Sequence, residues 1–194
     1  MKKFSFYCFL AMMLVGTTVL NAAEPQTKQG SKALFFGLNG LSEIGFDNSV
    51  IGAQYVFQDN MAIWADLGFK SKTEKPSENA QETTHSMVEI SAGFLNYIFQ
   101  KGPVAMYYSP QLGVGFGSDE QGSAKTSTNE LSVGVSLGAE WWLFDGISLT
   151  ATTFIGYKSL KTTTENGSSK VEATKNSFGI LGDTKSKFII SFYF

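Results

Sequence analysis

The sequence contains no arginine and has very few residues of several other types. Its 194 residues include 15 lysines but only one histidine and one cysteine. A chain without arginine lacks the planar bidentate donor that suits phosphate groups, and a formal net charge of −2 provides no basic surface. We therefore expect no nucleic-acid partner. Because His85 is the only histidine, a zinc site built on several imidazoles is excluded, and we expect neither a metal nor another cofactor.

Beyond its first residues the chain also lacks an uninterrupted apolar run of the ~18 residues that a membrane helix needs. Residues 1–23, MKKFSFYCFLAMMLVGTTVLNAA, combine two N-terminal lysines with an apolar stretch and end on Ala22 and Ala23. This arrangement predicts a cleaved secretory signal peptide, with a retained membrane helix as the alternative. Cleavage after Ala23 would remove Cys8, the only cysteine, so the exported chain must fold in an oxidising compartment without a disulfide.

Hydrophobic residues recur at every second position in most of the remaining segments. In the segment 131–142, for example, Leu131, Val133, Val135 and Leu137 alternate with serine and glycine. Such alternation predicts β-strands whose two faces meet different surroundings. We predict about eight strands, at residues 31–41, 48–58, 61–71, 84–99, 103–117, 129–143, 147–160 and 177–194.

The predicted connections alternate between short and long. Hairpins with tight turns at one end and long polar loops at the other explain this alternation. A propeller does not explain it, because each propeller blade needs four strands and each repeat here would hold only two. Asn166 and Gly167 form a favoured two-residue turn, so the last polar segment is either an extended hairpin or an irregular loop. The tight turns are 58–60, 100–102 and 144–146, and the polar segments are 70–84, 117–130 and 158–177.

The composition of the polar face indicates which side of the strands meets water. That face carries mainly Gly, Ser, Thr and Gln, whereas the charged residues are concentrated in the polar segments. Glycine weakens a strand unless space is scarce, as it is inside a narrow barrel. We therefore predict an all-β fold, an antiparallel up-and-down transmembrane β-barrel whose apolar face meets lipid. A soluble barrel of lipocalin type, with the apolar face inside, is the alternative.

A barrel in lipid must close, because each unsatisfied backbone amide there costs on the order of several kcal/mol. The first and last strands should therefore pair. The alternation then directs Phe188, Ile190, Phe192 and Phe194 to lipid, and Lys187, Ile189, Ser191 and Tyr193 to the interior.

Aromatic residues cluster near both ends of the predicted strands. Two such belts are typical of membrane interfaces, where aromatic rings lie at the level of the lipid headgroups. Phe57, Phe99, Trp141, Phe144 and Phe194 lie near the tight turns, and Phe69, Phe116, Tyr157 and Phe178 lie near the polar segments.

The signal peptide, the hairpin-linked strands and the terminal Tyr193 and Phe194 resemble the small eight-stranded outer-membrane barrels of the OmpA, OmpX and OmpW type. This resemblance covers residues 31–194, preceded by a short linker at 24–30. It implies short periplasmic turns, long extracellular loops, and contact with outer-membrane lipids and lipopolysaccharide. It also implies that the C-terminal strand is recognised by the outer-membrane assembly machinery, although Ile189 stands where that signal often has glycine.

Several charged and polar residues are predicted on the inward face. Counted from the tight turns and the C-terminus, Asp66, Glu140 and Lys187 should lie in one layer, and Glu89 and Lys158 in a second. Isolated charges there would be costly, so we predict interior ion pairs. The alternative is a wet lumen with solvated side chains. The predicted lumen network comprises Asp66, Glu89, Glu140, Lys158, Lys187, Gln54, Gln111, Tyr107 and Trp142.

These features predict a non-enzymatic outer-membrane barrel with a structural or surface-interaction role, since about eight strands leave room only for side chains inside. The resemblance to OmpW leaves open a narrow channel for small molecules, including hydrophobic ones. A lipid A-modifying enzyme is a third alternative. In the deacylase family, however, the catalytic Ser lies two residues beyond its His, and Met87 holds that place here, with Ser86 adjacent to His85. The external ligand is not specified by the sequence.

Overall fold

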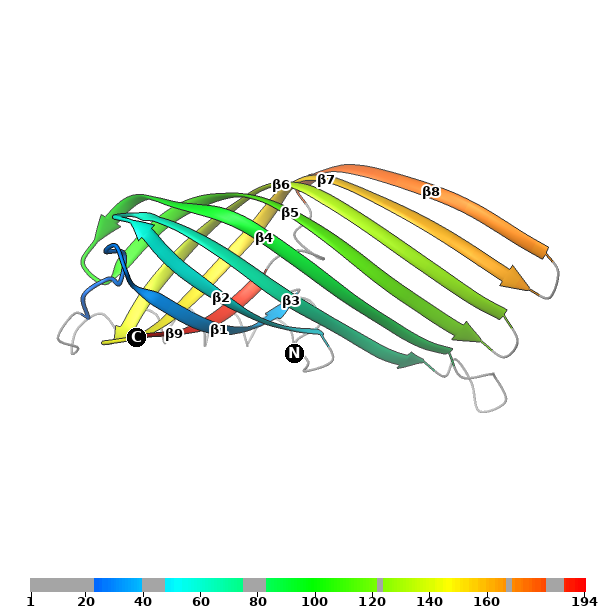
Figure 1. Cartoon of the computed structure of the whole chain (residues 1–194), viewed down its shortest axis with the longest axis horizontal. Helices are drawn as coiled ribbons and strands as arrows, with labels where there is room; N and C mark the ends of the chain where they lie inside the picture. Colours follow the sequence, from blue (N-terminus) through cyan, green and yellow to red (C-terminus); the bar gives the residue numbers. More distant parts are fainter. Residues whose placement is uncertain (1–22, 40–47, 75–82, 122–123, 167–168, 181–186) are drawn as a thin grey trace, which may run out of the picture.

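The computed structural model describes residues 23–39, 48–74, 83–121, 124–166, 169–180 and 187–194. Nine antiparallel strands make up most of this described part (Figure 1). None of the described residues forms a helix with the length and hydropathy of a membrane span. The strands are β1 (Lys32–Asn39), β2 (Asn48–Gln58), β3 (Met61–Glu74), β4 (Thr83–Lys101), β5 (Val104–Gln121), β6 (Ala124–Phe144), β7 (Ile147–Asn166), β8 (Ser169–Ile180) and β9 (Lys187–Tyr193).

Eight of these strands close into a ring. Strands β1 to β7 pair consecutively, β7 pairs with β9, and β9 pairs with β1. The predicted pairing of first and last strands is therefore confirmed, and so is the antiparallel all-β barrel. Closure provides backbone hydrogen-bond partners on both sides of β1 and β9, so neither strand has an open edge within the ring.

The register around the ring is offset. From Ser148 of β7 the paired residues run through β9 and β1 to β6, and they return to β7 at Lys158, ten residues further along. An offset of this kind requires the strands to tilt against the barrel axis, typically by roughly 35–45°. Residues that are paired neighbours therefore lie at different depths. The residues on this path are Ser148, Ser191, Phe35, Gly52, Asp66, Ser91, Gly113, Ser132 and Lys158.

The three predicted tight turns are confirmed. Asn60, Gly102 and Gly146 adopt positive φ angles of 64°, 56° and 78° in the turns that join β2 to β3, β4 to β5 and β6 to β7. A register shift lies just before each turn, at residues 56–58, 97–99 and 142–144. Such bulges increase the local twist, which helps each hairpin to follow the curved wall.

The polar segments differ from the prediction. Most of their described residues are strand rather than loop, since β3 runs to Glu74, β5 to Gln121, and β7 continues to Asn166. Strands β3 to β8 consequently extend together beyond β1 and β9 (Figure 1). Period-two hydrophobicity could not reveal these extensions, because their side chains are polar on both faces, while backbone pairing and β-favouring threonines still form the ladder.

The predicted strand 177–194 corresponds to two strands. Strand β8 forms the extended hairpin with β7, from Ile155 opposite Ile180 to Asn166 opposite Ser169, and only β9 completes the ring. The hairpin alternative for the last polar segment is thus the correct one. Gly167 of the predicted turn, and residues 181–186 between β8 and β9, lie outside the described residues.

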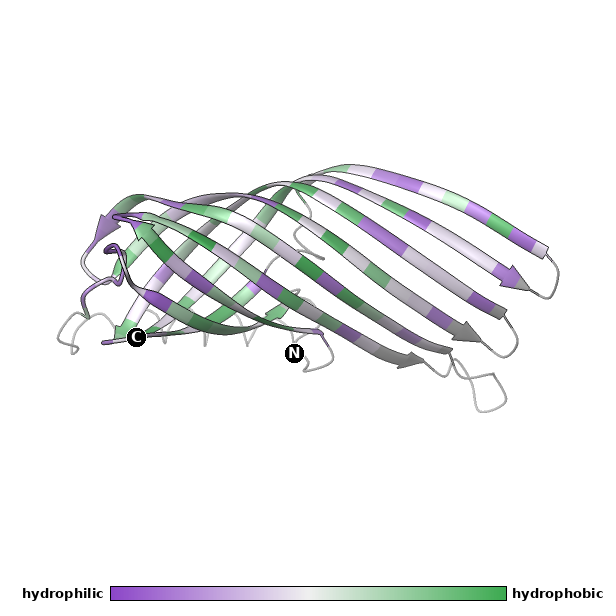
Figure 2. Cartoon of the chain, in the orientation of Figure 1, coloured by the Kyte–Doolittle hydropathy of each residue, from purple (hydrophilic) through white to green (hydrophobic). Residues whose placement is uncertain are grey.

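The predicted orientation of the two faces is confirmed. Val133, Val135 and Leu137 are 53%, 37% and 47% exposed on the outside of the barrel, whereas Ser132 and Ser136 between them are buried. Figure 2 shows the resulting alternation of hydrophobic and hydrophilic residues along the strands, and the more hydrophilic far ends of the long strands. The soluble alternative with an apolar interior is therefore wrong for this chain, because its large aliphatic side chains point outward.

Residues 23–31, which include the predicted linker at 24–30, lie against the turn end of the barrel. The amide of Gly30 donates to the carbonyl of Val56 at 2.8 Å, and the amide of Asn60 donates to the carbonyl of Thr27 at 2.8 Å. Ala23 is packed in a buried cluster with Val56 and aromatic side chains of the interior. The remainder of the predicted signal peptide, residues 1–22, lies outside the described residues.

Candidate functional site: a polar interior filled by side chains

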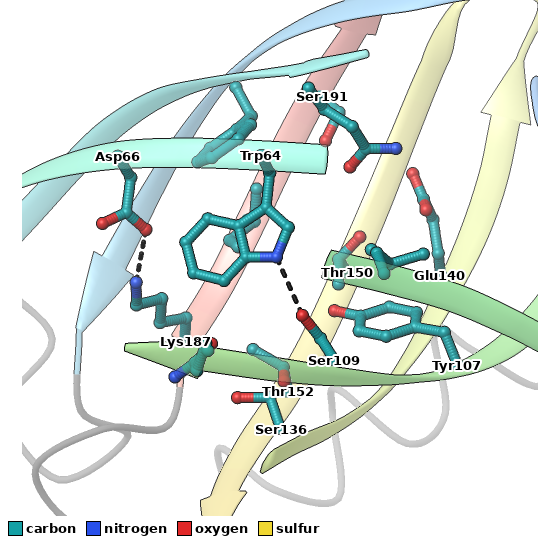
Figure 3. A pocket seen from close by; sticks show the side chains of 15 residues that line it. Trp64, Asp66, Tyr107, Ser109, Ser136, Glu140, Thr150, Thr152, Lys187 and Ser191 are labelled. Carbon is teal, nitrogen blue, oxygen red and sulfur yellow. Dashed lines mark hydrogen bonds and ion pairs between the residues drawn. The ribbon is translucent and has the colours of Figure 1, made fainter. Parts of the chain in front are cut away.

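Lys187 and Asp66 form an ion pair inside the barrel. They lie on β9 and β3, which are separated in the ring by β1 and β2, and their side chains are 8% and 2% exposed. The Lys187 ammonium also lies 5.3 Å from the centre of the Trp64 ring, within range of a cation–π contact. Trp64 donates its indole N–H to the hydroxyl of Ser109 at 2.8 Å (Figure 3). One ammonium group thus holds an acid and an aromatic ring in place.

Glu140 lies in a second cluster, nearer the tight turns, and is 2% exposed. Its carboxylate accepts hydrogen bonds from the hydroxyls of Ser148 at 2.5 Å, Tyr97 at 2.5 Å and Tyr193 at 2.8 Å. Gln54 donates its amide N–H₂ to both tyrosine hydroxyls at 3.3 Å. The five residues come from β2, β4, β6, β7 and β9, so this network joins most of the ring across its interior.

Asp66, Glu140 and Lys187, which were predicted to lie in one layer, line a common cavity. The structure brings Lys187 to Asp66, whereas Glu140 receives hydroxyl donors. Sequence reasoning missed Tyr97 and Ser148. Ser148 could have been found, because it lies just past the tight turn that follows Glu140, and Tyr97 lies on the inward parity of β4.

Lys158 of the predicted second layer forms an ion pair with Glu130. Its ammonium lies 2.6 Å from the Glu130 carboxylate, and the two side chains are 13% and 3% exposed. Glu89, the other residue of that predicted layer, accepts a hydrogen bond from Ser91 at 3.0 Å. Lys158 and Glu130 lie on the adjacent strands β7 and β6, whereas Glu89 is on β4. Glu130 was missed because it lay where the predicted polar segment 117–130 overlaps the predicted strand 129–143.

Aromatic rings fill the interior near the tight turns. Tyr97 packs edge-on against Tyr107 with ring centres 5.8 Å apart, and Trp142 lies 6.0 Å from Tyr97 and 6.1 Å from Tyr193. Gly138 makes room for Tyr107, since a Cβ atom there would come within 2.4 Å of the tyrosine ring. Tyr107 and Trp142, both predicted in the lumen, are 6% and 1% exposed. These rings obstruct the barrel at this end.

A small cavity of about 40 Å³ lies between the ion pair and the Glu140 network (Figure 3). Gln111, another predicted lumen residue, lines it together with Gln54, Asp66, Tyr107, Glu140 and Lys187. Since a buried water needs at least about 10–15 Å³ of such space, the cavity can hold only a few water-sized particles. It is far too small for a diffusion pore.

The residues predicted as aromatic belts lie on the outside of the barrel wall or at its end. Phe57 and Trp141 are half-buried, and Phe57 packs against Phe94 with ring centres 5.7 Å apart. The other seven are between 36% and 80% exposed: Phe69, Phe99, Phe116, Phe144, Tyr157, Phe178 and Phe194.

His85 does not form a nucleophile arrangement with the neighbouring serine. Its Nδ1 lies 2.8 Å from a carboxylate oxygen of Asp119 on the adjacent strand β5. The Ser86 hydroxyl lies 3.1 Å from the hydroxyl of Ser118 and points to the opposite face of β4. Among the described residues no group of three or more His, Cys, Asp and Glu side chains could hold a metal ion.

Together the closed ring of eight antiparallel strands, the outward apolar face and the polar interior define an up-and-down β-barrel with an extended wall. Its structure is similar to the crystal structure of a major outer membrane protein from Thermus thermophilus. The TM-score is 0.52 at 14% sequence identity, and the match covers 84% of this chain and 98% of that chain. At this identity the likeness concerns the fold. No protein-family model matches the sequence, and no curated protein matches it at a significant level.

Proposed function

We propose that this protein is an integral barrel of a bacterial outer membrane with a structural or surface-interaction role. The outward apolar face carries this proposal. Leu34, Ile63, Leu112 and Leu137 are between 47% and 59% exposed on different strands of the ring. A continuous apolar surface around a barrel is not stable in water, whereas hydrocarbon is its natural environment.

The orientation in the membrane follows from the unequal ends of the barrel. The end with three tight turns would face the periplasm, and the long polar extension of β3 to β8 would reach beyond the outer leaflet. The aromatic residues near both ends would lie at the two interfaces, where the outer leaflet supplies lipopolysaccharide as a partner. The extension would present the surface that contacts an external ligand or a neighbouring cell.

Export and assembly would use the two ends of the chain. Residues 1–23 would direct secretion and be cleaved, and the C-terminal strand would be recognised by the outer-membrane assembly machinery. Phe192 and Phe194 would carry that signal, since they are 51% and 74% exposed on the outside of the closing strand. The resemblance to the OmpA, OmpX and OmpW type supports these two steps.

The filled interior supports a role other than diffusion of solutes through the barrel. Aromatic rings and two ion pairs occupy the lumen. We propose no catalytic residue. A narrow channel is the second candidate, favoured by the polar cavity at mid-lumen. Single-channel recordings in planar bilayers distinguish the two, because a plugged barrel gives no steady conductance and a narrow channel does.

Labelling of introduced cysteines tests the proposed location, since the only cysteine, Cys8, lies in the predicted signal peptide. On intact cells a membrane-impermeant maleimide should label Thr163→Cys on the extension but not Leu137→Cys on the apolar face. Heat-modifiable migration in detergent gels and recovery with the outer-membrane fraction should accompany this result. Equal labelling at both positions, or recovery in the soluble periplasmic fraction, contradicts the proposal.

A further inference from the structure

Four oxygen-bearing side chains from four strands line the mid-lumen cavity without a complete set of hydrogen bonds. Glu140 comes from β6, Gln54 from β2, Thr150 from β7 and Ser191 from β9. Thr150 and Ser191 are each 5% exposed and line the cavity, and no hydrogen bond joins their hydroxyls to the other described residues. Neither hydroxyl oxygen is among the fully enclosed atoms that lack a partner, so both are open to the cavity. Hydroxyls of buried residues that open into a cavity are normally satisfied by a water molecule or an ion, so the cavity is a polar site.

Glu140 also has acceptor capacity left. An ionised carboxylate offers about four lone-pair sites, and the hydroxyls of Ser148, Tyr97 and Tyr193 occupy three of them. The Gln54 amide nitrogen donates to the two tyrosines, whereas its carbonyl oxygen receives no donor from the described residues. Carboxylate, amide and hydroxyl oxygens are hard ligands, which favour hard cations over soft ones.

The charges of the interior also favour a cation as the ligand of this cavity. Lys187 neutralises Asp66, and Lys158 neutralises Glu130, but within the described part of the chain Glu140 contacts no cationic side chain. A buried carboxylate surrounded only by neutral donors favours a positive ligand close by. The Glu140 carboxylate balances one positive charge. Because the Lys187 ammonium lines another side of the same cavity, a divalent ion would leave positive charge without compensation.

We propose that this cavity binds a single monovalent metal cation, such as Na⁺ or K⁺, through Glu140, Gln54, Thr150 and Ser191. The bound cation neutralises Glu140 and joins four strands at mid-lumen. This inference does not depend on the biological role of the barrel, because it concerns only the interior of the folded chain.

The test uses crystals of the exported, folded protein soaked in thallium acetate, because Tl⁺ replaces Na⁺ or K⁺ and scatters anomalously. The expected result is one anomalous peak in the cavity, lost in Glu140→Gln and in Thr150→Val. Thr150→Val keeps the three hydroxyl bonds to Glu140, so it separates loss of the cation from loss of the fold. Ser132→Ala is the matched control, since its buried hydroxyl bonds to the carbonyl of Gly113 and does not line the cavity.

A second measurement uses the same variants in detergent micelles. A cation that binds only the folded state raises Tm, so Tm should be at least about 2 °C higher in NaCl or KCl than in choline chloride at equal ionic strength. This difference should disappear in Thr150→Val and persist in Ser132→Ala. Water without an anomalous peak in the cavity, together with equal Tm in all three salts, overturns the proposal.

Discussion

Lys187 and Asp66 form an ion pair across the barrel interior although 121 residues separate them in the chain. The pair links the closing strand to β3, and both side chains are nearly inaccessible to solvent. Buried pairs of this kind are strongly coupled, because removal of one partner leaves the other charge unpaired.

The single variants Asp66→Leu and Lys187→Met should therefore each destabilise the barrel by roughly 3–5 kcal/mol. The double variant should recover much of that loss, because it removes both charges. Urea unfolding in lipid vesicles, followed by tryptophan fluorescence, measures the three values. A double variant whose loss equals the sum of the single losses would show that the two residues are not coupled.

Trp142 should be essential for the closed interior. The Trp142→Ala variant removes the largest fully buried side chain and two ring contacts near the tight turns. Single-channel recordings should show a measurable conductance in this variant and none in the unmodified protein. Trp141→Ala, which removes the neighbouring ring on the outer face, serves as the control. If Trp142→Ala stays silent while remaining folded, the aromatic plug is not what closes the lumen.

A charged side chain introduced on the apolar face should destabilise the barrel, whereas one introduced on the polar extension should not. Leu137→Lys should lower the free energy of unfolding in lipid by about 2–4 kcal/mol, because the ammonium would lie in hydrocarbon. Thr163→Lys, on the polar extension of β7, should change it by less than about 0.5 kcal/mol. Similar small effects at both positions would be inconsistent with a membrane-embedded wall.

Assembly of the barrel should depend on the aromatic ring of Phe194 at the end of the closing strand. Phe194 is 74% exposed, and its amide donates to the carbonyl of Lys32 at 2.9 Å. Phe194→Ser should reduce the fraction of protein that reaches the heat-modifiable, folded form in cells. Phe144→Ser removes another exposed ring at the same end and should have a smaller effect. The proposed assembly signal fails if the two variants assemble equally well.

Glu172 on the β7–β8 extension has a lowered pKa. Hydrogen bonds from Lys161 and Lys170 are the main cause, with ammonium–carboxylate distances of 3.1 and 3.2 Å. Because its pKa is lower in the folded state, Glu172 stabilises the hairpin above the ordinary pKa of a glutamate, and this contribution is lost as pH falls through the folded-state value. The titration midpoint of the Glu172 carboxyl ¹³C shift should lie at a lower pH than that of a glutamate without a lysine partner. Lys161→Met should raise this midpoint. An unchanged midpoint in the variant would assign the shift to another cause.

Several features of the fold could be predicted from local sequence. Alternation assigned Val133, Val135 and Leu137 to the outside, and the polar tight turns marked the hairpins, because side-chain direction in a strand has a period of two residues. The ends of the strands could not be predicted in the same way. In the part of β6 that precedes Glu130 and the part of β7 that follows Leu160, both faces of the sheet are polar. Hydrophobicity therefore has no period of two residues there.

The sequence by itself determined that strands form, which of their faces is apolar and where they reverse, since these properties depend on neighbouring residues. Only the tertiary structure decided which inward side chains meet. The ten-residue offset around the ring places Lys187 beside Asp66, Lys158 beside Glu130, and Tyr97 and Tyr193 beside Glu140. That offset belongs to the closed barrel as a whole, because it is fixed by the pairing of all eight strands, and no single segment of the chain contains it.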